Sequence, residues 1–195
     1  MNPAWVIQTG RLVLTPVGWR DLPDLRALKG DPGVYGQMLG GIRSPGQVAA
    51  ELAVDVSAWA ARGVGMWLVR TVRNPSRSGN VQGQGGNEGE AIGITGIHDR
   101  PDGRGMALRF AFTPASRGRG LAREAAGAAL RFAHQRAGLT RVVAVARDSN
   151  IASRTVLGSI GMRPCGTFDR DGSPMLLFES VVSPPSVDAL QRQER

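Results

Sequence analysis

The stretch Arg117-Gly118-Arg119-Gly120-Leu121-Ala122 lies between a predicted strand, Met106–Phe112, and an alanine-rich helix that is predicted to end near Arg136. Its two glycines let backbone N–H groups come close to a ligand. The helix that begins there adds N–H groups without intrahelical partners and the positive end of the helix dipole. We therefore expect this turn to bind a diphosphate, helped by the charge of its arginines.

This turn differs from two other phosphate-binding loops. It is not a Walker loop, because no Gly-Lys-Ser or Gly-Lys-Thr sequence follows it. It is not a Rossmann fingerprint either, because its glycines are too few and antiparallel strands are predicted to precede it.

Hydrophobic periodicity and turn signals extend the prediction outward from this stretch. The predicted order is β-α-α-β-β-β-α-β-α-β-β, a mixed sheet with helices on its faces. The strand–helix–strand passage after Met106 predicts one parallel crossover. Strands are predicted at 11–16, 66–72, 91–97, 106–112, 141–146, 167–168 and 175–178, and helices at 21–29, 44–62, 121–136 and 151–160.

Length and composition favour a single domain. The chain has 195 residues, of which 42% are hydrophobic and 21% charged. We expect one domain over residues 1–182, with a flexible loop at 74–89 and a polar tail at 183–195. No apolar run is long enough to span a membrane, and no secretory signal is apparent, so we expect a cytoplasmic protein.

The formal net charge of +8 admits nucleic acid, acidic proteins or anionic small molecules as partners. Lys29 is the only lysine, so a coding bias toward arginine would also explain the charge. Only 5% of residues are aromatic and no helix-turn-helix or zinc signature is present, which argues against nucleic acid. The single cysteine, Cys165, is expected to be a small buried hydrophobe. It excludes a disulfide framework, and the two histidines lack metal-ligand spacing, so we expect no metal.

Three segments resemble one enzyme superfamily. Arg117-x-x-Gly120-x-Ala122 matches the Arg/Gln-x-x-Gly-x-Gly/Ala signature of the GNAT (GCN5-related) N-acetyltransferases. The segment Thr9-Gly10-Arg11-Leu12-Val13-Leu14 is similar to the opening strand of the ribosomal-protein (RimJ/RimL-like) branch. Asn150-Ile151-Ala152-Ser153, followed by Leu157 and Ile160-Gly161-Met162, is similar to that branch's Asn-x-x-Ser helix.

The resemblance implies an α/β (α+β) fold. Its mostly antiparallel central sheet would have about 6–7 strands, flanked by about 4 helices, with splayed central strands. It implies direct transfer of the acetyl group of acetyl-CoA to an amine, without a metal. The amine would enter near the first helices and the loop around Asp99. The implied cofactor-binding residues are Phe110, Ala111 and Phe112 for the pantetheine arm, Arg117, Gly118, Arg119, Gly120, Leu121 and Ala122 for the diphosphate, and Asn150 and Ser153 on the other wall.

The chain departs from the family pattern where acid–base groups are expected. Ala107 occupies the position of a glutamate in many relatives, and Arg109 stands where glycine is usual. Leu157 occupies the position at which some members carry a tyrosine acid. The remaining catalytic candidates are Asp99 with its neighbour His98, and Ser153, which the resemblance places near the sulfur.

Each candidate also has a structural interpretation. Asp99 and His98 could be residues of a surface loop or sheet edge, Ser153 a helix-surface hydroxyl, and Asn150 an N-cap. At the level of the whole chain, the main prediction is an N-acetyltransferase acting on a protein N-terminus or a small-molecule amine, as a monomer or homodimer. The alternatives are a catalytically weak acyl-CoA-binding protein and, less favoured, a basic nucleic-acid-binding domain.

Overall fold

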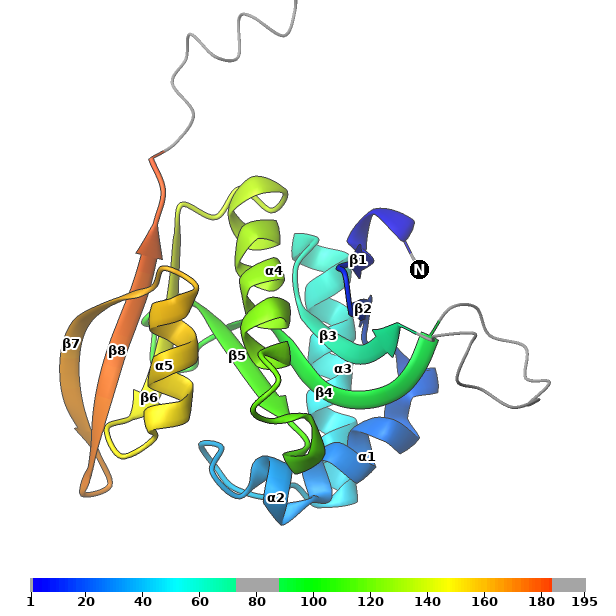
Figure 1. Ribbon diagram of the computed structural model, residues 1–195, viewed down its shortest axis with the longest axis horizontal. Coiled ribbons are helices and arrows are strands. Elements are labelled where there is room, and N and C mark those ends of the chain that lie inside the picture. Colours follow the sequence, from blue (N-terminus) through cyan, green and yellow to red (C-terminus); the bar gives the residue numbers. More distant parts are fainter. Residues whose placement is uncertain (1, 73–87, 184–195) are drawn as a thin grey trace, which may run out of the picture.

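Eight strands form one sheet in the computed structural model, which describes residues 2–72 and 88–183 (Figure 1). The strand order is β1-β2-β3-β4-β5-β6-β8-β7, and only the pair β5–β6 is parallel. The strands are β1 (Ile7–Gln8), β2 (Leu12–Pro16), β3 (Met66–Val72), β4 (Glu88–Asp99), β5 (Met106–Phe112), β6 (Arg141–Arg147), β7 (Arg163–Arg170) and β8 (Ser173–Val181). The predicted loop 74–89, apart from its last two residues, and the tail from 184 onward lie outside the described residues.

Helices cover both faces of the sheet (Figure 1). One face packs against α4 and α5, and the other against α1, α2 and α3, so the molecule has two apolar cores. The helices are α1 (Leu22–Gly30), α2 (Pro32–Tyr35), α3 (Pro45–Arg62), α4 (Leu121–Gln135) and α5 (Ile151–Ser159). None of these helices is both long and apolar enough to cross a membrane.

The predicted element order is confirmed, but the counts of about 6–7 strands and about 4 helices are slightly low. The two extra elements, β1 and α2, are only 2 and 4 residues long, too short to show a hydrophobic period. Asp31 ends α1 and also begins α2, because its side chain accepts a hydrogen bond from the Gly33 N–H at 2.7 Å.

Local signals define α3 most clearly. Ser44 is its N-cap, and a reciprocal capping box joins Ser44 and Gln47. At its other end Gly63 adopts a left-handed conformation with φ 63°. Its apolar side chains Val48, Leu52 and Trp59 are buried, which anchors the helix against the sheet.

The two central strands separate along most of their length. Antiparallel neighbours on either side, β4–β5 and β6–β8, stay in register from end to end. By contrast β5 and β6 share a single register pair, Ala107 with Val143, near the beginning of both strands. The splayed central strands expected from the sequence are therefore present, and they leave a gap toward the end of β5.

The expectation for Cys165 was wrong. The residue is exposed rather than buried, because it lies on β7, the edge strand that pairs only with β8. Most side chains of β7 face solvent, since no described helix covers this end of the sheet. A short apolar residue type indicates burial only where a second layer is present to cover it.

Candidate functional site

The gap between β5 and β6 is lined by backbone groups of alternate residues. The Thr113 N–H donates to the Ile92 carbonyl of β4 at 2.9 Å. In an antiparallel pair every second residue of a strand bonds to the same neighbour, so the backbone of Ala111, two residues before Thr113, also faces β4. The same alternation turns the backbone of Phe110 and Phe112 away from β4, toward the gap. Three residues were predicted to hold a pantetheine arm, and two of them, Phe110 and Phe112, direct their backbone N–H and C=O groups into the gap.

A narrow cavity of about 70 Å³ lies in this gap. Its walls come from β5, β6, the start of α5 and the segment after α2. The lining residues are Gln37, Met38, Leu39, His98, Arg100, Leu108, Arg109, Phe110, Ala144, Val145, Ala146, Arg147, Asn150, Ser153 and Leu157.

Asn150 and Ser153 both line the cavity, as the sequence predicted for the wall opposite β5. Asn150 also caps α5, since its Oδ1 accepts a hydrogen bond from the Ser153 N–H at 3.0 Å. Its structural and binding roles are thus compatible. Leu157 is buried and gives the cavity an apolar wall at the position where some relatives carry a tyrosine.

The predicted diphosphate turn is a cradle of backbone N–H groups. Gly118 and Gly120 have φ values of 70° and 71°, the left-handed region that glycine tolerates best. Gly120 is the N-cap of α4 and supplies no side-chain cap. The first helical bond there runs from the Glu124 N–H to the Gly120 carbonyl. Among the described residues, the N–H groups of 118–123 donate no hydrogen bond, so they are available to an anion.

Arg117 anchors this cradle to the opposite helical layer. Its guanidinium donates to the carbonyl oxygen of Gly33 at the start of α2. Its own N–H donates to the Pro114 carbonyl, closing the short 3₁₀ turn Pro114–Ser116. Arg119 is exposed at the rim. Arg117 therefore has a positioning role as well as a favourable charge.

A second anchor of the cradle was missed at the level of sequence. Glu124, in the first turn of α4, accepts hydrogen bonds from the Thr9 hydroxyl at 2.6 Å and from Arg11 Nε at 2.6 Å. Arg11 Nη1 also donates to the Arg119 carbonyl at 2.8 Å. Burial opposes ionisation of Glu124, but these hydrogen bonds outweigh it and lower its pKa. The Thr9-Gly10-Arg11 segment, quoted above for its resemblance, was the signal that could have indicated this contact.

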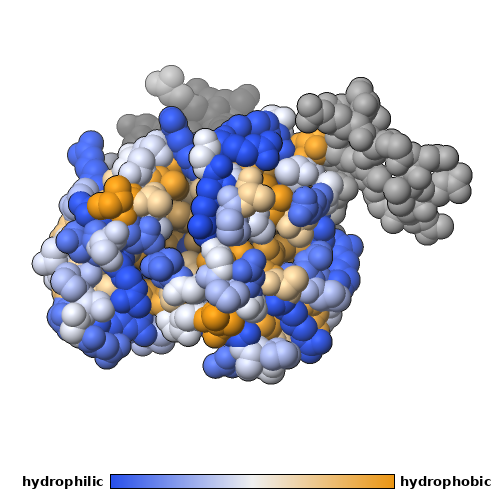
Figure 2. Space-filling model, turned by 60° about the horizontal axis from the view of Figure 1, so that its bottom comes forward, coloured by the Kyte–Doolittle hydropathy of each residue, from blue (hydrophilic) through white to orange (hydrophobic). Residues whose placement is uncertain are grey.

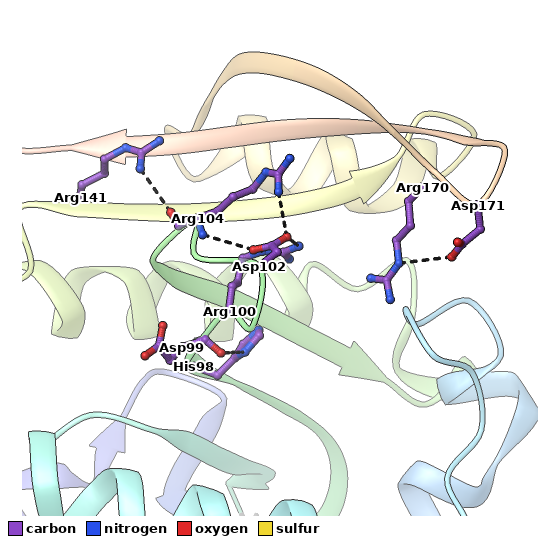
Figure 3. Close-up of polar contacts among 8 residues, drawn as sticks. All are labelled: His98, Asp99, Arg100, Asp102, Arg104, Arg141, Arg170 and Asp171. Carbon is purple, nitrogen blue, oxygen red and sulfur yellow. Dashed lines mark hydrogen bonds and ion pairs between the residues drawn. The ribbon is translucent and has the colours of Figure 1, made fainter.

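His98 and Asp99, the two neighbouring acid–base candidates, face different surroundings. Asp99 is 56% exposed and forms an ion pair with Arg62 at 3.1 Å, outside the cavity. His98 lines the cavity, and its Nδ1 lies 3.0 Å from the Asp99 carbonyl oxygen (Figure 3). Because a carbonyl only accepts, Nδ1 carries the proton and Nε2 is left as an acceptor. Burial, reinforced by the nearby Arg109 charge, lowers the pKa of His98 to about 4.

A larger groove of about 510 Å³ adjoins the cavity, with which it shares Leu39, His98, Arg100 and Arg109. It was not predicted from the sequence. The β4–β5 turn, the end of β7 and the segment between α2 and α3 form its walls. Its lining residues are Leu39, Gly40, Arg43, His98, Arg100, Pro101, Asp102, Arg104, Arg109, Phe168, Asp169 and Arg170.

Most arginines of this groove are held by neighbours. Asp102 binds Arg100 through Nε at 2.9 Å and Arg104 through Nη1 at 3.1 Å (Figure 3). The Arg104 guanidinium also stacks over the Phe168 ring, 4.0 Å from its centroid. The hydrogen bonds from Arg100 hold the pKa of Asp102 far below its ordinary value. This ordered turn gives the groove a rigid, positively charged wall.

The lower side of the molecule carries the α2 helix and the diphosphate turn (Figure 1). Figure 2 brings this side forward and shows a mostly hydrophilic surface with hydrophobic residues visible toward its middle.

No group of three or more His, Cys, Asp and Glu side chains in residues 2–72 and 88–183 is placed to hold a metal ion.

Splayed parallel strands followed by a helix N-terminus with free N–H groups are the features that the sequence resemblance implied for an acetyltransferase. The sequence matches the acetyltransferase (GNAT) domain over residues 11–163. The chain therefore belongs to the GNAT acetyltransferase family, whose members use acetyl-CoA, and the resemblance found in the sequence is confirmed.

Solved structures agree with this assignment. A Bordetella pertussis protein assigned to the GNAT acetyltransferases is 26% identical, with a TM-score of 0.73 over 90% of this chain and 99% of its own. An acetyltransferase from Agrobacterium tumefaciens is 24% identical, with a TM-score of 0.72 over 91% and 94%. RimL, a ribosomal L7/L12 alpha-N-protein acetyltransferase solved with coenzyme A, shares the fold at 14% identity and a TM-score of 0.69 over 91% and 98%. No curated protein matches the sequence.

Proposed function

We propose that this chain transfers the acetyl group of acetyl-CoA directly to a primary amine, either a protein N-terminus or a small molecule. The observation that carries the proposal is the continuity of the site. The cavity in the β5–β6 gap shares His98 and Arg109 with the arginine-lined groove, and the backbone cradle of residues 118–123 follows β5 directly in the chain. A coenzyme and an acceptor can thus approach one another from different sides.

The residues present fit acetyl-CoA. The free N–H groups between Gly118 and Arg123 would hold its diphosphate at the positive end of α4. The backbone of Phe110 and Phe112 would hydrogen-bond its pantetheine arm, with Asn150 and Ser153 along the facing wall. RimL, which has the same fold, was solved in complex with coenzyme A, and this supports coenzyme A as the ligand class.

The site chemistry favours positioning over a strong base. Acetyl-CoA supplies the thioester that the amine attacks. A strand N–H at Phe110 or Phe112 would polarise the thioester carbonyl, since both face the gap. His98 Nε2 would accept a hydrogen bond from the attacking amine, but its low pKa keeps it from holding the proton at neutral pH. The proton lost by the amine then passes to water, and the sulfur released from the broken C–S bond gains one.

This arrangement suits an amine that is readily neutral. An α-amine has a pKa near 8, whereas a lysine side chain has a pKa near 10.4, a difference of roughly 3 kcal/mol in the cost of deprotonation. A site without a strong base therefore favours α-amines. Asp99, although predicted as a candidate, would act only indirectly through the carbonyl that orients His98.

Two measurements test the proposal. Acetyl-CoA at 100 times its dissociation constant should stabilise the fold by roughly 2.7 kcal/mol, which thermal unfolding would detect. Release of coenzyme A thiol should then be followed with a panel of peptides and small amines. Stabilisation with turnover of at least one amine is the expected result. Stabilisation without any turnover would instead indicate the acyl-CoA-binding alternative, and absence of both would refute the proposal.

A further inference from the structure

We propose that the acceptor amine carries an anionic group, and that Arg109 binds this group and so determines acceptor specificity. This inference rests on the proposed function, because it names the class of amine that would enter the same site. The anion could belong to an acidic peptide or to a small amino acid or phosphorylated amine. These sources share a carboxylate or phosphate within reach of a free α- or primary amine.

The position of Arg109 points to the acceptor rather than the coenzyme. On β5 its side chain alternates with those of Leu108 and Phe110, which pack in the core beneath α4. It shares a face with Ala111, which packs against the layer of α1, α2 and α3. The Arg109 guanidinium is thus on the side of the sheet opposite α4, where the narrow cavity joins the larger groove.

Arg109 is the arginine of the groove whose charge lacks a bonded carboxylate. Arg100 and Arg104 bind Asp102. Elsewhere in the groove, Arg43 Nε lies 2.5 Å from Glu51 Oε1. Arg170 Nε lies 3.7 Å from Asp171 Oδ2 (Figure 3).

In residues 2–72 and 88–183 the side chain of Arg109 makes no hydrogen bond or ion pair, although it is half-buried. A half-buried guanidinium with open donors favours a ligand that accepts from it, and charge-assisted bonds there are strong.

The surrounding field reinforces this preference. Five arginines line the groove against two carboxylates, Asp102 and Asp169. His98 adds no charge at neutral pH. One carboxyl outside the groove lining opposes this field: the pKa of the partly buried Asp55 is raised to about 6, mainly by desolvation, so it is still largely ionised at neutral pH and interacts with the Arg109 charge. A positively lined groove attracts anions and repels polyamines and lysine-rich peptides.

The dimensions of the two spaces fit a short acidic chain. The cavity in the gap, at about 70 Å³, is too small to hold the body of an acceptor as well as the thioester. The groove, at about 510 Å³, has room for the following part of the acceptor. Arg109 lines both, so it can contact a carboxylate or phosphate close to the amine. A bidentate contact of this kind would fix the direction of the chain as well as its charge.

Matched acceptors test the inference by binding and by turnover. The probes are the peptides Ser-Asp-Glu-Gly-Trp, Ser-Asn-Gln-Gly-Trp and Ser-Lys-Arg-Gly-Trp, together with aspartate, phosphoethanolamine and spermidine. Affinity is measured by titration calorimetry on protein saturated with coenzyme A, and turnover by thiol release from acetyl-CoA. The acidic peptide should bind at least tenfold more tightly than its neutral counterpart, or about 1.4 kcal/mol, and the difference should shrink in high salt. Preference for a peptide over aspartate or phosphoethanolamine would identify the source of the anion.

Variants of Arg109 separate recognition from folding. Arg109→Gln should raise KM for the acidic peptide about tenfold with little change in kcat, and Arg109→Lys should restore part of the affinity. Arg109→Glu should invert the preference toward the lysine-bearing peptide. Arg163→Gln, an exposed site on β7 outside the groove lining, is the matched control and should leave both constants unchanged. Circular dichroism and acetyl-CoA affinity report whether each variant is folded.

The outcomes distinguish this inference from the proposed function. Tighter binding of spermidine or of the lysine-bearing peptide to the wild-type protein would overturn the inference, even if these amines were acetylated. The same holds if a folded Arg109→Glu variant kept the acidic preference. Absence of turnover with every amine would refute the proposed function, whereas the calorimetric titrations would still decide whether the groove selects anions.

Discussion

The predicted diphosphate cradle and the arginine-lined groove are built from different kinds of groups and from different parts of the chain. The cradle consists of consecutive backbone N–H groups, from Gly118 to Arg123, at the start of one helix. The groove consists of side chains from the β4–β5 turn, β5, β7 and the segment after α2. In the proposed function, backbone groups would recognise a feature common to every coenzyme A molecule, whereas side chains from separate elements can vary with the acceptor.

The cradle and the groove also differ in the kind of charge that they present. The cradle attracts an anion through the helix dipole and free N–H groups, which do not titrate. The proposed acceptor side contains partly buried ionisable groups, including Asp55 and His98, whose pKa values are shifted by burial. We therefore expect substitutions and pH to affect the two regions differently.

The largest effect is expected at Gly120. Replacing it by Val places a β-branched residue at φ 71° and distorts the cradle. Acetyl-CoA affinity, measured by calorimetry, should fall more than 100-fold. Gly138→Val is the matched control, because Gly138 has φ 67°, open space around it, and a position after α4 away from the site. Both variants should lose similar folding stability, and only the first should lose binding; equal loss of binding would contradict the assignment.

Glu124→Gln tests the anchor that holds the cradle to the first strands. It should lower the free energy of unfolding by about 1.5 kcal/mol, the lower end for hydrogen bonds to charged groups, because half of the Arg11 side chain is in water. Acetyl-CoA binding should weaken as well. Since the pKa of Glu124 is depressed in the folded protein, its contribution is present above its ordinary pKa of 4.5 and disappears as pH falls below that.

Its matched control is Glu179→Gln, which breaks an exposed pair with Arg141 and should cost at most about 1 kcal/mol. The two variants are compared by urea unfolding at pH 7 and at pH 4. If Glu124→Gln destabilised the protein no more than Glu179→Gln at pH 7, the anchoring role would be refuted.

Asp55→Asn tests the electrostatics of the acceptor side. Burial raises the pKa of Asp55 to about 6 from 3.8, so the protonated form favours folding. Its stabilisation is complete below pH 3.8 and is lost as pH rises through about 6. The uncharged Asn should keep the low-pH behaviour and stabilise the protein by roughly 1–3 kcal/mol at pH 7.5, on the order of the free energy equivalent to the raised pKa, which already includes the attraction of Lys29. Urea unfolding between pH 4 and 8 measures this; a destabilised variant at pH 7.5 would show that the ion pair with Lys29 dominates.

The smallest effects are expected at the acid–base candidates. His98→Ala should lower kcat only two- to fivefold, because its low pKa makes it an orienting acceptor rather than a proton store. Ser153→Ala should have a similar effect, and Asp99→Asn almost none, since Asp99 pairs with Arg62 outside the cavity. The ratio kcat/KM should rise with pH as the amine loses its proton. A loss of 10²–10⁴ in any one variant, with acetyl-CoA affinity intact, would identify an essential acid or base.

Much of the fold and the coenzyme side could be predicted from the sequence. Ser44 and Gly63 mark the ends of α3, and Gly118 and Gly120 mark the cradle, because caps and left-handed glycines depend on local backbone geometry. The parallel crossover followed from the order of elements. The family signature at Arg117 predicts the same diphosphate site as the glycines and the helix start.

What the tertiary structure alone decided is which distant side chains meet. The contact of Arg11 with Glu124 joins residues 113 positions apart. The exposure of Cys165 depends on β7 being the last strand. The arginine-lined groove around Arg109 combines four separate segments. No local rule of spacing specifies such contacts, because they arise from the packing of whole elements, whereas the turn at Arg117–Ala122 is specified by φ angles and hydrogen-bond donors within six consecutive residues.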